Sequence, residues 1–388
     1  ARKAFSEILF KESLNTDIHE SFKKLFYHSV TSLTRKDKKV GVMLSGGLDS
    51  SAVAIALKEN NYDEVFTYSA NFHHVDDNNY MHESKYQENI SNITSYQHTP
   101  IQMEEKSPIK PIKKFTKILN QPIQFPNIYL FEQITNKLLD DGIEIILDGN
   151  DGDNTVSHGF EVLFLYFKNL KLIKFIKEIY LYSKFKKSSF IRLLVVLIKQ
   201  ALRDILNIKV SQSGTTLLKE NLVIKKNPKN NISYFSSHKK KLSIDLHFLG
   251  NEYRNSFFRF YGIENFSPFY DEELIDFCIN MPSKHKLNEG NTRKILRDFL
   301  SDYLPKDHVK RDKSILTSGL LKNFSCNDLQ IIKDEYASLN SSLSHLLETS
   351  KIESIIKNLE SGKQIKEEEI LNLQVFMSAN TFMNEFNF

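Results

Sequence analysis

The sequence predicts an α/β fold in which a parallel sheet flanked by helices fills the first part of the chain and the second half is mainly α-helical. Short apolar runs at residues 40–44, 64–70 and 143–147 have the length and composition of strands. Helical periodicity or helix-forming composition precedes and separates these runs. From Phe160 onward, apolar residues recur at helical spacing with few strand signals. Strands that alternate with helices are typical of parallel sheets, which gives the α/β prediction.

The first elements are a helix, a strand, a tight turn and a second helix. Apolar residues from Ile18 to Leu33 recur three and four positions apart, which predicts an amphipathic helix. The first strand follows it and ends in Ser-Gly-Gly at residues 45–47, which predicts a tight loop. Residues 51–58 then have helix-forming composition, and another helix is expected over residues 81–93.

Two segments of the second half stand out. The most apolar run, Ile191 to Ile198, is interrupted by charge and falls far short of the roughly 20 residues that a membrane span needs, so we expect a buried helix. Residues 209–243 are rich in Ser, Asn and Lys and have little apolar periodicity. We expect a long, flexible surface excursion there.

Composition limits the class of protein. The chain has 388 residues and a formal charge of +4, which gives no reason to expect a nucleic-acid partner. Its two cysteines, Cys278 and Cys326, form no metal-binding spacing and favour a reducing compartment. The charged N-terminus lacks the apolar core of a signal peptide, so a cytoplasmic protein without a membrane partner is expected. Because the first residue is Ala1 rather than Met, a preceding domain stays an open possibility.

The loop between the first strand and its helix indicates phosphate binding. Such a turn presents backbone N–H groups and a helix N-terminus to an anion. A carboxylate beside them would repel phosphate unless a divalent cation intervened, so Asp49 predicts Mg²⁺. Neither the Walker pattern nor the Rossmann glycine pattern occurs here. The residues concerned are Leu44, Ser45, Gly46, Gly47, Asp49, Ser50 and Ser51.

Four ordered motifs resemble the asparagine-synthetase-like branch of the ATP-pyrophosphatase (PP-loop) superfamily. Residues 45–50 resemble its SGGxDS pyrophosphate loop, and residues 148–153 stand where that branch has SGEGAD. Residues 261–271 are similar to GVEARVPFLD, and residues 293–313 to its LLR, YLP and WRxK region. The resemblance implies a HUP-like nucleotide-binding core and an amide-forming ligase that converts ATP to AMP and pyrophosphate.

The resemblance also implies roles for individual residues. Asp49 and Asp153 would hold Mg²⁺ on the phosphates of ATP, and the backbone and hydroxyls of residues 44–51 would cradle the pyrophosphate. Lys313 would offset the negative charge that develops on the reacting groups, and Glu264 would be a buried catalytic glutamate near them. The nucleotide contacts would include Ala70, Asp148 and Gly149.

The same resemblance suggests a division of the chain. Residues 1–159 would form the ATP-binding core with its N-terminal helix. Residues 160–388 would form a mainly helical substrate-binding region that returns to the active site at residues 261–319. The segment from 261 lacks the usual Arg and reads Glu264-Asn265-Phe266-Ser267, while Asn150 replaces the family's glutamate. The roles of Asn150 and His158 stay open.

Three functions remain. The one we favour is a natural-product or peptide tailoring ligase, akin to β-lactam synthetases and lasso-peptide cyclases, which adenylates a small-molecule or peptide carboxylate and transfers the acyl group to an amine. The second is an asparagine synthetase or amidotransferase domain that uses ammonia, since no glutaminase domain is present in this sequence. The third is a non-catalytic sensor of ATP or AMP. A glutaminase or a precursor-peptide-processing protein is a possible partner.

Overall fold

The computed structural model describes most of the chain. The described residues are 17–72, 81–103, 109–123, 128–206, 217–219, 238, 242, 245–311, 326–363 and 365–386.

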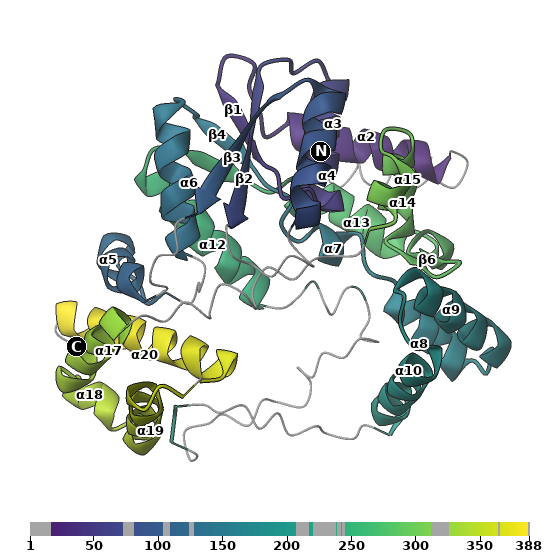
Figure 1. Ribbon diagram of the computed structural model, residues 1–388. Coiled ribbons are helices and arrows are strands. Elements are labelled where there is room, and N and C mark those ends of the chain that lie inside the picture. Colours follow the sequence, from purple (N-terminus) through teal and green to yellow (C-terminus); the bar gives the residue numbers. More distant parts are fainter. Residues whose placement is uncertain are drawn as a thin grey trace.

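A five-stranded parallel sheet forms the centre of the fold (Figure 1). Its strands are β1 (Val40–Met43), β2 (Val65–Phe72), β3 (Gln97–Met103), β4 (Ile145–Leu147) and β5 (Glu264–Phe266). Their order is β3-β2-β1-β4-β5, so β1 is central and β4 is its direct neighbour. Because parallel strands all end at one edge, the loops after β1 and β4 lie side by side there.

Helices cover both faces of the sheet. Alternate side chains of the strands enter two separate apolar cores, Val42 and Leu147 in one and Ile146 in the other. The first core is covered by α2 (Ile18–Thr31), α3 (Leu48–Glu59), α4 (Met81–Thr94), α13 (Glu272–Asn280) and α14 (Lys294–Ser301). The second is covered by α5 (Lys110–Leu119), α6 (Ile128–Asp140) and α12 (Asp245–Phe260). The predicted α/β architecture is confirmed.

Two helical bodies lie beyond the sheet (Figure 1). The first contains α8 (Phe160–Lys168), α9 (Leu172–Phe185) and α10 (Phe190–Ile205), packed around their own apolar cluster. The second contains α17 (Cys326–Ala337), α18 (Ser341–Ser344), α19 (Thr349–Glu360) and α20 (Glu367–Glu385), which share another. The prediction of a mainly helical second half is therefore confirmed.

The structure adds two strands to the prediction and corrects one expectation. The edge strands β3 and β5 were not predicted, and β5 brings a segment of the second half into the sheet. The apolar run Ile191 to Ile198 does form a helix, α10, but the prediction that it is buried is wrong. Ile191 is 71% exposed and Val195 45% exposed, because α10 packs only one side against α8 and α9.

The segment expected to be a flexible excursion, residues 209–243, lies mostly outside the described residues. Its described residues pack against other elements. Leu217 and His238 are buried, and the backbone N–H of Glu348 donates to the Leu217 carbonyl oxygen at 2.7 Å. Among the described helices, none is long and apolar enough to cross a membrane.

Candidate active site

The loop after β1 places a helix N-terminus at the carboxyl edge of the sheet. The N–H of Leu44 donates to the Tyr68 carbonyl oxygen at 2.7 Å, which continues the pairing of β1 with β2 up to the turn. Gly47 is the N-cap residue of α3 and has no side chain to accept from the first turn. This end of the helix therefore suits an anion, which can accept hydrogen bonds from its N–H groups.

Two hydroxyls hold the turn in shape. The Oγ atoms of Ser45 and Ser50 lie 3.1 Å apart, and Ser50 Oγ accepts from the N–H of Ser45 at 3.2 Å. Ser45 Oγ in turn accepts from the N–H of Gly47 at 3.2 Å. The loop is thus fixed by its own side chains, as a preorganised phosphate cradle requires.

Gly46 packs tightly against α4. Its φ is +71°, which is a left-handed conformation that favours glycine. A Cβ atom there would lie 3.0 Å from Tyr86 Cβ and 3.2 Å from the Glu83 carbonyl oxygen. A side chain at this position would therefore disturb both the turn and its packing.

Two side chains from a distant segment hold the carbonyl oxygen of Gly46. His308, in the short helix α15 (Lys306–Val309), places Nε2 3.0 Å from this oxygen and donates to it, and Nη1 of Arg311 donates to the same atom. Arg311 also pairs through Nη2 with Glu83 Oε1 at 2.7 Å and stacks on the Tyr86 ring. We refer to His308, Arg311 and Glu83 as the loop clamp.

The environment of His308 keeps its ring neutral. The residue is fully buried, and this burial lowers the pKa of the imidazole to about 4. Its Nδ1 atom is buried and has no hydrogen-bond partner in the described part of the chain. A neutral ring can donate through Nε2 to Gly46 without adding charge to the core.

The loop after β4 packs backbone against backbone on the start of α3. A Cβ atom on Gly149 would lie 2.5 Å from the backbone nitrogen of Ser50, and one on Gly152 would lie 2.6 Å from Asp49 Oδ1. The structure therefore brings the two aspartate motifs together. Asp153 follows Gly152 directly, in the short helix α7 (Gly152–Thr155).

Asp148 is a buried hydrogen-bonding centre beneath this loop. Its carboxylate accepts from the Asn150 N–H at 3.0 Å, the Asn265 amide at 3.3 Å and the Ser267 hydroxyl, and Arg254 Nε lies 3.7 Å away. Burial raises the pKa of the Asp148 carboxyl in spite of Arg254. Because the Asp148 side chain is used within the protein, a nucleotide contact from this turn would come from the backbone of residues 148–149.

The donor groups fit a magnesium ion bound together with phosphate. The carboxylates of Asp49 and Asp153 are 17% and 18% exposed, so both reach the surface of the site. Mg²⁺ typically takes one or two carboxylates plus the oxygens of substrate phosphates and water. No three His, Cys, Asp or Glu side chains of the described residues are grouped so as to hold a metal by themselves.

Both carboxylates have cationic or titratable neighbours. Nη1 of Arg293 lies 2.8 Å from Oδ2 and 3.0 Å from Oδ1 of Asp49, and His158 Nε2 lies 3.6 Å from Asp153 Oδ2. Arg293 is buried at the start of α14 with φ +53°. The sequence predicted neither this ion pair nor the loop clamp, although Arg293 and Arg311 lie in quoted motifs, because spacing alone does not show which side chains meet.

The remaining predicted site residues are placed differently. Ala70 lies near the carboxyl end of β2, on the side of the site. Glu264 does not reach the site: it begins β5 at the opposite edge of the sheet, is 52% exposed and pairs with Arg35 at 3.0 Å. The expectation of a buried Glu264 near the reacting groups is therefore wrong. Lys313 lies outside the described residues, two positions after Arg311.

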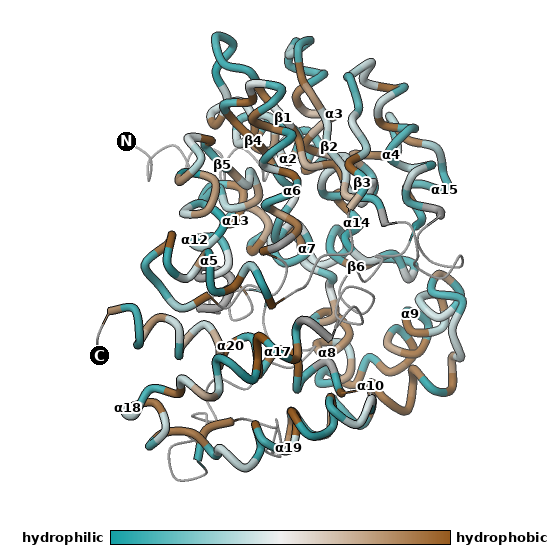
Figure 2. The backbone as a smooth tube through the Cα atoms, turned by 60° about the vertical axis from the view of Figure 1, so that its left-hand side comes forward, coloured by the Kyte–Doolittle hydropathy of each residue, from teal (hydrophilic) through white to brown (hydrophobic). Residues whose placement is uncertain are grey.

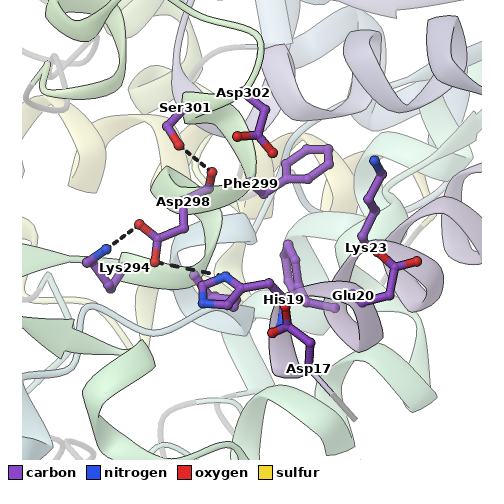
Figure 3. A pocket seen from close by; sticks show the side chains of 11 residues that line it. Asp17, His19, Glu20, Lys23, Lys294, Asp298, Phe299, Ser301 and Asp302 are labelled. Atoms are coloured by element: carbon purple, nitrogen blue, oxygen red, sulfur yellow. Dashed lines mark hydrogen bonds and ion pairs between the residues drawn. The ribbon is translucent and has the colours of Figure 1, made fainter.

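The structure also has a pocket of about 470 Å³ between α2 and α14 (Figure 3). Acidic and basic side chains line it, and Lys294 and His19 approach Asp298 across it. It shares no residue with the loops described above, and the first turn of α2 that borders it already carries the acidic side chains of Asp17 and Glu20, which disfavour an anion there. The candidate active site is therefore the group of loops at the carboxyl edge of the sheet.

Comparison with known proteins agrees with this geometry. The model of the family described as asparagine synthase matches residues 21–384. No curated protein matches the chain.

Proposed function

The chain belongs to the asparagine synthase family, and from this premise we propose that it is an ATP-dependent ligase that adenylates a carboxylate, releases pyrophosphate and transfers the acyl group to an amine. Family membership supports an ATP-using carbon–nitrogen ligase. The observation that carries the finer proposal is the contact between the Ser45–Ser51 loop and residues 149–152, which sets Asp49 beside the Asp153 turn.

The loop would bind the leaving pyrophosphate. The N-terminus of α3 offers N–H groups and a favourable dipole to the β and γ phosphates. A bound Mg²⁺, held by Asp49 and Asp153, would neutralise phosphate charge. The loop clamp would keep the Gly46 carbonyl oxygen turned away from the phosphates, since His308 and Arg311 both bond that oxygen.

In this scheme the Asp49 carboxylate interacts with two cations, the Arg293 guanidinium and the bound Mg²⁺. Without nucleotide, Arg293 balances the Asp49 carboxylate at 2.8 Å. When phosphate binds, the same guanidinium can turn part of its donor set towards the phosphate oxygens, because one Nη atom alone makes the contacts to Asp49.

We retain Lys313 as the residue that stabilises the oxyanion when the amine attacks the acyl-adenylate. The support is its place in the chain: it follows Arg311 by two residues, and Arg311 contacts the phosphate loop. Arg297 further fixes this segment, since its guanidinium donates to the backbone oxygens of Val309 and Arg311. A fixed ammonium group is suited to stabilising charge that develops in the transition state.

The acceptor side favours a tailoring ligase over an ordinary asparagine synthetase. Asn150, which stands at the family's glutamate, donates its side-chain amide to Asp148, and so does Asn265 from the segment that lacks the usual Arg. These side chains stabilise a buried carboxylate and are not available to bind aspartate. A small-molecule or peptide carboxylate with its own amine acceptor is the proposed substrate class.

The test measures which phosphate bond breaks. The full chain is incubated with Mg·ATP, a panel of amino acids and peptides, and hydroxylamine as a general amine, and the nucleotide products are separated. The proposal expects AMP and pyrophosphate in equal amounts, and Asp49→Asn is expected to lower their formation by a factor on the order of 10² or more.

The control is Asp302→Asn, an exposed carboxylate in the pocket between α2 and α14, which should leave the rate unchanged. Formation of ADP in place of AMP, or an Asp49→Asn rate equal to that of the parent, would refute the proposal.

A further inference from the structure

The helical body of α8, α9 and α10 exposes an unusual amount of apolar surface. Of the nineteen large apolar side chains that are exposed among the described residues, twelve lie between residues 160 and 206. Ile173 is 85% exposed and Ile191 71% exposed. Figure 2 shows α9 and α10 in predominantly hydrophobic colours away from the sheet. Exposed apolar side chains gathered on one small body in this number indicate an interaction site.

Four of the six exposed apolar side chains of α10 and its C-cap form a stripe along one side of the helix. Ile191, Val195, Leu202 and Leu206 follow one another at intervals of four, seven and four residues. Each interval returns to nearly the same side of an α-helix. Leu197 and Ala201 on another side of α10 are buried in the cluster with α8 and α9. The stripe is therefore a different face of α10 from the one that packs against α8 and α9.

Positive charge flanks the stripe. Arg192, Lys199 and Arg203 repeat at intervals of seven and four residues, one position after the apolar stripe, so they form a parallel basic stripe on α10. Residues 160–206 contain eight lysines and two arginines against three acidic residues, a formal charge of +7. The whole chain carries only +4, so the rest of the chain is net negative and the basic charge is concentrated here.

The composition of this surface separates three kinds of partner. Protein interfaces favour aromatic residues and disfavour Lys, whereas eleven of the twelve exposed apolar side chains are aliphatic and eight of the ten cations are Lys. A second copy of the chain would bring two bodies of charge +7 together. A helix that lies in an anionic bilayer interface combines aliphatic side chains with flanking Lys and Arg.

We propose that the α8–α10 body binds the surface of an anionic lipid bilayer, with the α10 stripe entering the interface and the basic stripe contacting the lipid headgroups. In this proposal the α8–α10 body lies on the bilayer surface, and none of the described helices is long and apolar enough to cross it. This inference goes beyond the proposed ligase activity and is independent of it, since no residue of the α10 stripe touches the phosphate loop.

The test uses the absence of tryptophan from the sequence. Val195→Trp places a single fluorescent reporter in the α10 stripe. Val375→Trp is the matched control, because both valines lie on helices and both are 45% exposed. Each full-length variant is titrated with vesicles of phosphatidylcholine alone and with anionic vesicles that contain roughly 30% phosphatidylserine. The expected result is a blue shift of Val195→Trp with the anionic vesicles only, and none for Val375→Trp.

A second variant tests the basic stripe. In the Val195→Trp background, the combined substitutions Arg192→Gln, Lys199→Gln and Arg203→Gln should weaken binding to anionic vesicles by roughly a hundredfold, since each cation near such a surface contributes about fivefold. Equal shifts at both reporters, no shift at either, or affinity unchanged by the three substitutions would overturn the proposal. A shift with poly-glutamate but not with vesicles would overturn it in favour of an acidic protein partner.

Ligase activity provides the remaining control. Pyrophosphate release with a soluble acceptor should be unchanged in Val195→Trp, because the Val195 side chain is exposed and lies outside the apolar cluster that holds α8, α9 and α10 together. Loss of vesicle binding without loss of activity would then contradict the lipid proposal alone, and loss of the AMP product would contradict the proposed function alone.

Discussion

At the scale of single residues, the Gly46 carbonyl oxygen shows how side chains from distant parts of the sequence fix the phosphate loop. Arg311 bonds this oxygen, pairs with Glu83 at 2.7 Å and covers the Tyr86 ring. Both members of the ion pair are at most 10% exposed. Arg311 therefore has two separable effects, one on stability through Glu83 and one on the loop through Gly46.

Arg311→Met should separate these effects. It removes the ion pair of the buried Glu83 carboxylate with Arg311, which costs roughly 3 kcal/mol of unfolding free energy. Adding Glu83→Gln should recover most of that stability, because the buried negative charge that Arg311 balanced is removed. The KM for ATP should be higher than that of the parent protein in both the single and the double variant. Both lack the hydrogen bond from Arg311 to the Gly46 carbonyl oxygen. Urea unfolding and steady-state kinetics provide the two measurements, and a double variant with restored KM would contradict the assigned role.

His308 predicts a pH dependence of stability. Burial lowers the pKa of its imidazole from 6.5 to about 4. Between these values the unfolded chain binds a proton that the folded chain does not, so stability rises with pH in this window. The stability that depends on a neutral His308 ring is fully present above pH 6.5. It is lost as the pH falls towards 4, and the total change in the free energy of unfolding is roughly 3 kcal/mol.

The measurement is the unfolding free energy of the parent and His308→Gln from pH 4.5 to 8. Glutamine can still donate to the Gly46 carbonyl oxygen but does not titrate. The difference between the two proteins should therefore shift in favour of the variant as the pH falls. Superimposable pH profiles would show that His308 is not buried as a neutral ring.

At the scale of elements, the site depends on how closely the loop after β4 approaches the start of α3. Gly149→Ala would place a Cβ atom 2.5 Å from the Ser50 backbone nitrogen, so one of the two loops must move. We expect ATP affinity to fall by about tenfold or more, which is about 1.4 kcal/mol of binding free energy, because one of the two loops proposed to contact the nucleotide is displaced. Isothermal titration with Mg·ATP measures it.

The control for this variant is Gly250→Ala in α12. Its Cβ atom would meet only Arg254 Nη1 at 3.9 Å, and alanine favours the helix over glycine. Its nucleotide affinity should match that of the parent. Equal affinity in Gly149→Ala would mean that the two loops do not need this close contact.

The elements also show what local sequence can and cannot predict. The strand-loop-helix of residues 40–58 was predicted correctly because apolar runs and the glycine pair are local signals. Strands β3 and β5 were missed because β3 carries polar residues at an edge and β5 has only three residues. The burial of α10 was predicted wrongly, since an apolar run identifies a helix but not the partner that covers it.

The same distinction applies to the site. The loop residues and both aspartate motifs lie together as their positions after neighbouring strands predict. Glu264 was misplaced because a motif does not show at which end of a strand a side chain stands. Arg293 and His308 contact the loop over more than 240 residues of sequence, so only the fold brings them there.

At the scale of the whole molecule, the main core joins both halves of the sequence. The apolar cluster beneath the phosphate loop extends from Phe22 to Val309. Ten of its thirty buried side chains come from residues 269–309. The sheet follows the same pattern, since β5 hydrogen-bonds to β4 along its edge. Binding site and core are therefore built from the same long-range contacts.

This arrangement predicts that residues 1–159 do not fold as a separate unit. Losing ten buried apolar side chains removes roughly 15 to 30 kcal/mol of burial free energy, at about 1.5 to 3 kcal/mol each. Natural domains are stable by only about 5 to 15 kcal/mol, so the fragment should show no cooperative unfolding transition. A fragment of residues 1–325 keeps every member of both sheet cores and should retain one. Circular dichroism during urea denaturation compares them, and cooperative unfolding of residues 1–159 would show that the strands and helices of the first half suffice for folding.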